Sequence, residues 1–148
     1  MRMIDVRSGL EVIDRDRCLE LLASRGIGRV GVVVGGRPVI LPVNYGLDGE
    51  RVVFRTAPGT KLDAAVRRTN VAFEIDEADA SSHGGWSVVV SGWADEVTGP
   101  DLDRARALGI EPWAEGERSH FIAIQPDRIT GRRVTGSAPT RPDAGPAV

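Results

Sequence analysis

The segment VVFRTAPGTKL, at positions 52–62, carries two cations and a hydroxyl at a spacing that suits an anion site. Arg55 and Thr56 come where a strand pattern ends, and Lys61 comes where a helix is expected to begin. A turn through 57–59 would bring the three side chains together beside the unpaired N–H groups of the first helical turn. This combination suits a phosphate best. The alternative is that both cations are solvated, with Lys61 costing about 0.3–1 kcal/mol at a helix start, where acidic residues are favoured.

The other reactive residue types are few and isolated. Cys18 is the only cysteine, so the chain has no internal disulfide and no cysteine metal cluster. His83 and His120 have no Cys, His or carboxylate partners at metal-ligand spacing, so we expect surface or hydrogen-bonded histidines. No triad and no carboxylate pair is visible. The sequence therefore assigns no catalytic residue and no metal site.

Aromatic side chains are a second kind of candidate. Tyr45, the only tyrosine, is placed either to line a pocket or to pack at a barrel rim. Trp86 and Trp93 face opposite sides of a regular strand, so one is expected in the core or an interface, while the other can stack on a flat ring. Trp113, in the loop-like stretch EPWAEG, either covers a cleft mouth or has a simple packing role.

The elements that must position these residues are mostly short strands. Gly35-Gly36 and Asp48-Gly49 separate β-branched runs and predict two-residue hairpin turns. Pro38 and Pro42 cannot donate a ladder hydrogen bond, so their strand should be irregular, bulged or open to something else. The expected strands cover 28–34, 37–45, 50–56, 70–76, 86–97 and 119–134, the last as one strand or two broken near Pro126.

Short helices are expected between these strands. Asp14 can cap a helix over 15–25, and Thr60 and Asp63 have capping-box-like spacing at the start of a helix over 60–68. A third helix begins at Pro100 and Asp101. Gly92 lies inside the long 86–97 strand and predicts a bend or bulge there. Six strands with short flanking helices predict a mainly β fold, a small antiparallel barrel, because closure removes exposed strand edges.

Length and charge limit the classes of protein. The chain has 148 residues, and its 19 basic and 21 acidic side chains give a net charge of −2 with the signs interspersed. That balance argues against nucleic acid or an anionic membrane as the main partner. Without a signal-peptide pattern or an apolar run near about 18 residues, a cytoplasmic protein is expected. We expect one domain over 1–135 and a disordered, Pro- and Gly-rich tail over 136–148.

The ordered segments RPVILPVNYGLDGERVVFRTAPGTKLDAA, NVAFEID and WSVVVSGWADEV resemble the pyridoxamine 5'-phosphate oxidase-like family of split β-barrels. The likeness is to its small actinobacterial, flavin-nucleotide-binding branch, and it covers about residues 14–134. It implies a six-stranded Greek-key split barrel of the FMN-binding type that forms a homodimer. It also implies one FMN, or in some branches a deazaflavin or haem, in each of two clefts between the subunits.

The resemblance also assigns residues by position. Arg55, Thr56 and Lys61 match the segment that grips the flavin phosphate, and Trp86 and Ser87 match the start of a strand that reaches the flavin site. PVNY matches the strand whose backbone runs along the isoalloxazine ring, where Val43 and Asn44 would meet the ring. The cofactor-binding residues expected from the sequence are therefore Pro42, Val43, Asn44, Tyr45, Arg55, Thr56, Lys61, Trp86 and Ser87.

The function implied is that of an FMN-dependent oxidoreductase or reductase acting on a small molecule, because the flavin itself carries the redox chemistry. A deazaflavin-dependent reductase, a non-enzymatic flavin- or haem-binding module, and a barrel that has lost its ligand are the alternatives. Vitamin B6 oxidation is not expected. Arg132 and Arg133 are present near the C-terminus without the arginine and tryptophan motif that holds the substrate in true pyridoxamine phosphate oxidases.

Overall fold

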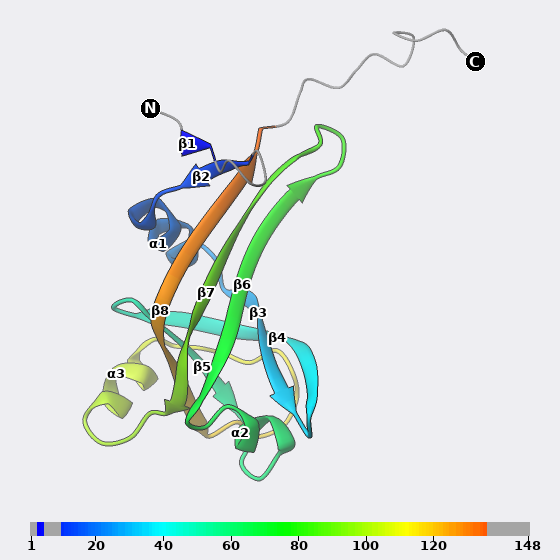
Figure 1. Cartoon of the computed structure of the whole chain (residues 1–148). Coiled ribbons are helices and arrows are strands. Elements are labelled where there is room, and N and C mark those ends of the chain that lie inside the picture. The colour runs from blue at the N-terminus through cyan, green and yellow to red at the C-terminus, as the bar shows by residue number, and fades with distance from the viewer. Residues whose placement is uncertain (1–2, 5–9, 136–148) are drawn as a thin grey trace, which may run out of the picture.

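The computed structural model describes residues 3–4 and 10–135 of the chain. Long strands β6, β7 and β8 run side by side along the molecule, with α1, β1 and β2 near one end and α2 and α3 near the other (Figure 1). The predicted tail, 136–148, lies outside the described residues. The strands are β1 (Met3–Ile4), β2 (Glu11–Ile13), β3 (Ile27–Val34), β4 (Arg37–Asp48), β5 (Arg51–Thr56), β6 (Thr69–Asp79), β7 (Gly84–Glu96) and β8 (His120–Val134), and the helices are α1 (Arg15–Ala23), α2 (Lys61–Ala65) and α3 (Asp101–Ala107).

Six of these strands close into an antiparallel barrel, as the sequence predicts. The hydrogen-bonded order is β8-β5-β4-β3-β6-β7, and β7 pairs back onto β8. Strands β3, β4 and β5 follow one another, and β6 returns to lie beside β3, which is the Greek-key arrangement. The short strands β1 and β2, which the sequence did not predict, extend the sheet from the end of β8.

The two predicted hairpins are present, and positive backbone angles explain their glycines. Gly35 and Gly36 have φ values of 58° and 79° between β3 and β4. The second turn is shifted by one residue from its predicted place. Asp48 pairs with Arg51, so the turn residues are Gly49 and Glu50, with φ of 63° at Gly49. Glycine takes this conformation without steric cost.

Strand β4 is open along part of one edge, which is one of the outcomes that its prolines predict. Its pairing with β5 begins only at Tyr45, whereas its pairing with β3 runs through to Arg37. The N–H of Tyr45 points to β3, where it donates to the carbonyl of Gly26 at 3.0 Å. Because backbone groups alternate along a strand, the nitrogens of Pro38 and Pro42 face the other edge. No described strand pairs with that edge, so the prolines remove no ladder hydrogen bond.

The predicted irregularity in the long strand is a bulge between β7 and β8. The register shifts between Ser91 and Gly92, and Gly92 lies opposite Pro126. A Cβ atom on Gly92 would lie 2.1 Å from the backbone oxygen of Gln125, so the close approach of the two strands requires glycine. Pro126 does not divide the last strand, since it sits at the irregularity, where a missing N–H is tolerated.

The helices begin as predicted but end earlier. Asp14 caps α1 by accepting from the N–H of Arg17 at 2.9 Å, and Thr60 caps α2 by accepting from the N–H of Asp63 at 3.1 Å. The helix predicted over 60–68 stops at Ala65. Beyond it, Val66 is fully buried in the barrel core and the chain turns into β6, so tertiary packing ends the helix.

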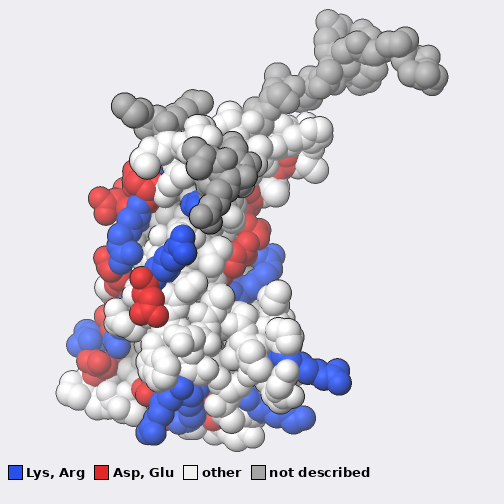
Figure 2. Space-filling view, in the orientation of Figure 1, with Lys and Arg blue, Asp and Glu red and all other residues white. Residues whose placement is uncertain are grey.

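The core lies mainly inside the barrel, and a smaller cluster lies outside it, between the β5–β8 wall and α3. The largest fully buried side chains include Phe54, Phe73, Ile122 and Ile124. On the face shown in Figure 2, basic and acidic side chains are interspersed, in keeping with the small net charge. No helix among the described residues is both long and apolar enough to span a bilayer.

Candidate functional site

The candidate site is a cavity of about 370 Å³ beside the open edge of β4. Three segments enclose it: β4 near Asn44, the end of β5 with the following loop at 57–60, and the stretch 112–118 before β8. Its volume lies in the usual range for small-molecule sites. The residues that line it are Ile27, Leu41, Pro42, Val43, Asn44, Arg55, Thr56, Ala57, Thr60, Leu62, Pro112, Trp113, Ala114 and Arg118.

The fold brings five of the predicted binding residues to this cavity. Pro42, Val43 and Asn44 form its β4 wall, and Arg55 and Thr56 form its β5 wall. These two groups are separated along the chain. β4 and β5 pair only from Tyr45 to Asp48 of β4, and they diverge on the N-terminal side of Tyr45, so the two groups face one another across the space that opens there. The sequence segment that suggested a phosphate site and the segment that suggested a ring-binding strand thus line one space.

Arg55 is positioned by the backbone of the stretch that covers the cavity. Its Nε donates to the carbonyl of Arg118 at 2.8 Å, and its Nη1 donates to the carbonyl of Ile110 at 2.9 Å. The guanidinium also lies over the ring of Phe121, 5.0 Å from the centroid. Nη2 makes no hydrogen bond to any described residue, so its two N–H groups remain available to an anion in the cavity.

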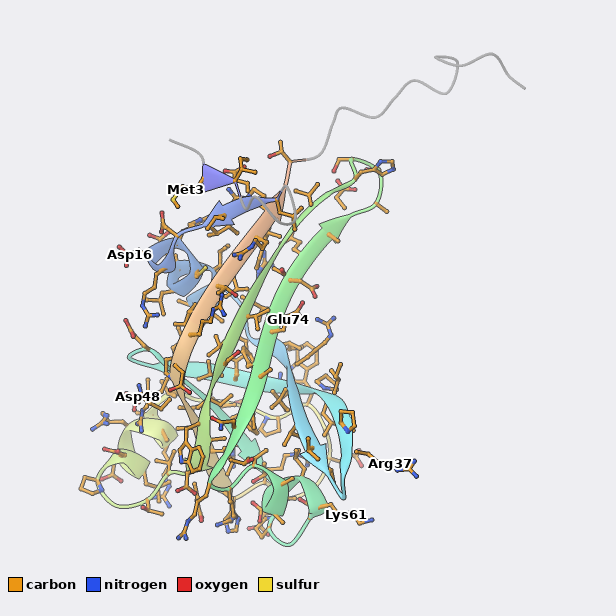
Figure 3. All side chains as sticks on the ribbon, viewed as in Figure 1. Met3, Asp16, Arg37, Asp48, Lys61 and Glu74 are labelled. Atoms are coloured by element: carbon orange, nitrogen blue, oxygen red, sulfur yellow. The ribbon has the colours of Figure 1, made fainter. Side chains whose placement is uncertain are left out.

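Lys61 lies outside the cavity walls. It is the first residue of α2, its side chain is exposed, and Figure 3 shows it at the end of the molecule, directed away from the barrel. Its chain neighbours Thr60 and Leu62 do line the cavity. Lys61 therefore acts on the cavity only through its charge or by a change in side-chain conformation.

The hydroxyl of Thr56 is already engaged by the protein. It donates to Oδ1 of Asp63 at 2.7 Å, and Thr56 is 1 % exposed. Burial by itself would raise the pKa of Asp63, but hydrogen bonds from Thr56 and His120 and the charge of Arg67 outweigh it and hold the pKa at about 2. The side chain of Thr56 is therefore not free to bind a ligand, and it holds a carboxylate that is ionised at neutral pH.

Asn44 and Trp113 join the cavity wall to the covering stretch. The side-chain oxygen of Asn44 accepts from the backbone N–H of Trp113 at 2.9 Å. Both residues, with Ile27, also line a second hollow of about 480 Å³ that reaches Ser24 and Arg25, so the two spaces adjoin. Trp113 is 78 % exposed, at the mouth of the cavity, which is one of its two predicted positions.

The remaining predicted residues lie elsewhere. Tyr45 is in the core, where its hydroxyl donates to the carbonyl of Leu22 at 2.6 Å and its ring packs edge-on against Phe73. Burial strongly raises the pKa of Tyr45. Trp86 and Ser87 line a separate hollow near the other end of the barrel. The guanidinium of Arg25 lies over the Trp86 ring, 5.2 Å from its centroid.

Sequence reasoning missed the charged group behind the cavity. Asp63 was expected only to belong to a capping box. His120 was expected to be a surface or hydrogen-bonded histidine, and it is hydrogen-bonded, but its partners were not predicted. The structure joins both to Arg67, and Arg67 to Glu96 on β7. No spacing rule could have found this group, because its members come from three separate segments. In the described part of the chain, no cluster of His, Cys, Asp or Glu is arranged to hold a metal ion.

Comparison with known proteins places the chain in a family. The sequence model described as pyridoxamine 5'-phosphate oxidase matches residues 14–133, which is most of the chain. The chain belongs to the pyridoxamine 5'-phosphate oxidase family. An uncharacterized protein of Mycobacterium tuberculosis is 36% identical over 146 residues, covering 94% of this chain and 96% of that protein.

Solved structures support the same membership. The FAD binding protein of Mycobacterium smegmatis is 37% identical, with a TM-score of 0.74 over 84% of this chain and 98% of that chain. A conserved protein of unknown function from Corynebacterium diphtheriae is 32% identical, with a TM-score of 0.69 over 83% of this chain and 96% of that chain. The split barrel implied by the sequence is therefore the fold of the family.

Proposed function

We propose that this protein binds a flavin nucleotide in the cavity, with the phosphate beside the β5–α2 loop (residues 57–60) and the ring along β4. The observation that carries the proposal is the cavity itself. It is lined by the edge of β4 that no described strand pairs with and by Arg55, whose Nη2 has no hydrogen-bond partner among the described residues. A relative that is 37% identical and nearly fully covered is a FAD binding protein, which supports the same ligand class here.

The donors and apolar walls fit such a ligand. Nη2 of Arg55 is free to donate to the phosphate, because Nε and Nη1 already donate to two backbone carbonyls. A charge-assisted contact of this kind contributes roughly 1.5–3 kcal/mol. The unpaired backbone edge of β4 at Pro42–Asn44 borders the cavity and offers groups that pair with the polar edge of a flat heterocycle, and Leu41 and Ile27 supply apolar contact. Lys61 completes the proposed phosphate end through its charge at the rim.

We propose further that the site is completed in a homodimer. Outward-facing positions of the β3–β4 hairpin carry Ile27, Val33 and Ile40, which are 39%, 60% and 72% exposed. Exposed apolar groups that share one face mark an interaction surface. Trp86 and Ser87 lie away from the cavity of their own chain. In this proposal they contribute to the flavin site of a second copy.

The reaction proposed is oxidation or reduction of a small molecule. The flavin, when bound, supplies the transfer of electrons or hydride. The described residues bind its phosphate, orient its ring and, through Trp113 and the rest of the 112–118 stretch, limit the access of water. FMN is the flavin that the sequence resemblance implies, and FAD shares the same first phosphate. Deazaflavin, haem and a non-enzymatic binding role are outcomes that the test below separates.

The test begins with the purified protein. Flavin absorbance bands and a flavin released on denaturation, identified by mass spectrometry, would support the proposal, whereas a Soret band would point to haem. The ligand-free protein is then titrated with FMN, FAD and riboflavin. We expect FMN to bind at least about tenfold more tightly than riboflavin, because riboflavin lacks the phosphate. Equal affinity would contradict a phosphate site at Arg55. Turnover of a nicotinamide reductant with an acceptor panel distinguishes an enzyme from a carrier.

A further inference from the structure

Asp63 is the one charged side chain buried in the part of the chain that the structure describes, at 5% exposure. It does not line the cavity, yet its carboxylate holds the β5–α2 loop, which does. Oδ1 accepts from the hydroxyl of Thr56, where the loop begins, and Oδ2 accepts from the N–H of Gly59 at 3.4 Å. The N–H of Asp63 donates to Oγ1 of Thr60 at 3.1 Å. One residue thus contacts the start, middle and end of the loop from behind.

The same carboxylate ties the loop to the barrel wall. Oδ1 lies 2.9 Å from Nδ1 of His120 on β8, and Arg67 Nη2 lies 3.3 Å and 3.2 Å from the two oxygens. Arg67 also pairs with Glu96 of β7, and Nε2 of His120 lies 3.8 Å from that carboxylate. Asp63, Arg67, Glu96 and His120 are the charged or titratable groups that meet here. They link the loop to two strands of the barrel.

We propose that Asp63, held by His120 and Arg67, is a positioning residue that sets the β5–α2 loop in the conformation that accepts the flavin phosphate. This inference rests on the proposed function. Asp63 touches no bound group, since the loop stands between it and the cavity. Its role is to fix the direction of the loop's backbone N–H groups and of the adjoining end of β5, which bears Arg55.

Positioning and simple electrostatics predict opposite results for one substitution. Asp63 is an anion close to a proposed anion site, so its charge alone repels a phosphate. If charge were all that mattered, Asp63→Asn would strengthen FMN binding. If the carboxylate positions the loop, Asp63→Asn weakens FMN binding, because the amide cannot accept from Thr56, Gly59, His120 and Arg67 together. The sign of the change therefore decides between the two.

The experiment compares FMN with riboflavin in the full-length protein. The wild type, Asp63→Asn and the control Asp103→Asn, whose side chain is 88% exposed on α3, are titrated with both flavins at neutral pH. We expect Asp63→Asn to lose at least about fivefold in FMN affinity. Its riboflavin affinity should stay within about twofold of the wild type, and the control should match the wild type for both ligands. Unchanged or tighter FMN binding, or equal loss for both flavins, would overturn the positioning role.

A second pair of variants tests the same idea without changing Asp63. His120→Ala removes the ring whose Nδ1 contacts both Asp63 and Arg67, and His120→Asn replaces it with an amide that reaches the position of Nδ1. We expect the preference for FMN over riboflavin to fall in His120→Ala and to be restored in His120→Asn. If the wild type prefers FMN and all these variants keep that preference, only the positioning role fails. If the wild type shows no preference, the proposed phosphate site itself fails.

Discussion

The buried carboxylate of Asp63 makes the stability of the fold depend on acid in a predictable way. Its pKa falls from 3.8 to about 2 in the folded protein. A difference of nearly two pKa units corresponds to about 2–3 kcal/mol, because one unit of pKa is about 1.4 kcal/mol. The folded-state pKa is lowered, so this contribution is fully present above pH 3.8 and is lost as the pH falls through 3.8 toward about 2. Burial of the side chain keeps solvent from screening it.

Urea unfolding of the wild type and Asp63→Asn measures this contribution directly. We expect the wild type to be more stable by about 2–3 kcal/mol at neutral pH, and the difference to disappear as the pH approaches about 2. The exposed-carboxylate variant Asp103→Asn should track the wild type throughout. A gap of constant size over the whole pH range would refute the reasoning, because it would mean that the charge of Asp63 does not stabilise the fold.

Other substitutions test the cavity, the interface and the bulge. Arg55→Gln should weaken FMN binding at least about tenfold and spare riboflavin more, measured by titration, because it removes the proposed phosphate contact. Lys61→Ala should cost on the order of threefold, an effect that vanishes in high salt, since Lys61 lies outside the cavity walls. Ile40→Glu, on the exposed hairpin face, should give a monomer in sedimentation; a persistent dimer would place the interface elsewhere. Gly92→Ala should lower the free energy of unfolding by at least about 2 kcal/mol, because its Cβ would meet a carbonyl oxygen of β8 at 2.1 Å, whereas Gly31→Ala, with its nearest atom at 3.8 Å, should be tolerated sterically.

Part of the candidate site follows from local sequence, and part does not. Pro42 and Arg55 were predicted on the walls of one site, and both line the cavity. The prolines indicated an open edge of β4, and that edge lies next to the end of β5. Tyr45 was a candidate for the same wall. It lies one position along from Asn44, and successive side chains of a strand point to opposite faces, so its ring enters the core instead.

The sequence by itself determined the six barrel strands, the three helices and their order. Period-two patterns, glycine turns and capping residues such as Asp14 and Thr60 are local signals, because they reflect backbone preferences over a few residues. It also determined the place of the bulge, since Gly92 interrupts a strand that is otherwise regular. The ordered motifs carried enough information to indicate the family.

Only the tertiary structure decided which donors are free and which charges are buried. Two nitrogens of Arg55 donate to backbone carbonyls that lie 55 and 63 residues further along the chain. Asp63 meets His120 across 57 residues because the barrel closes β5 onto β8. Such contacts depend on where distant segments meet, and the balance of burial and hydrogen bonding that sets a pKa exists only once they have met.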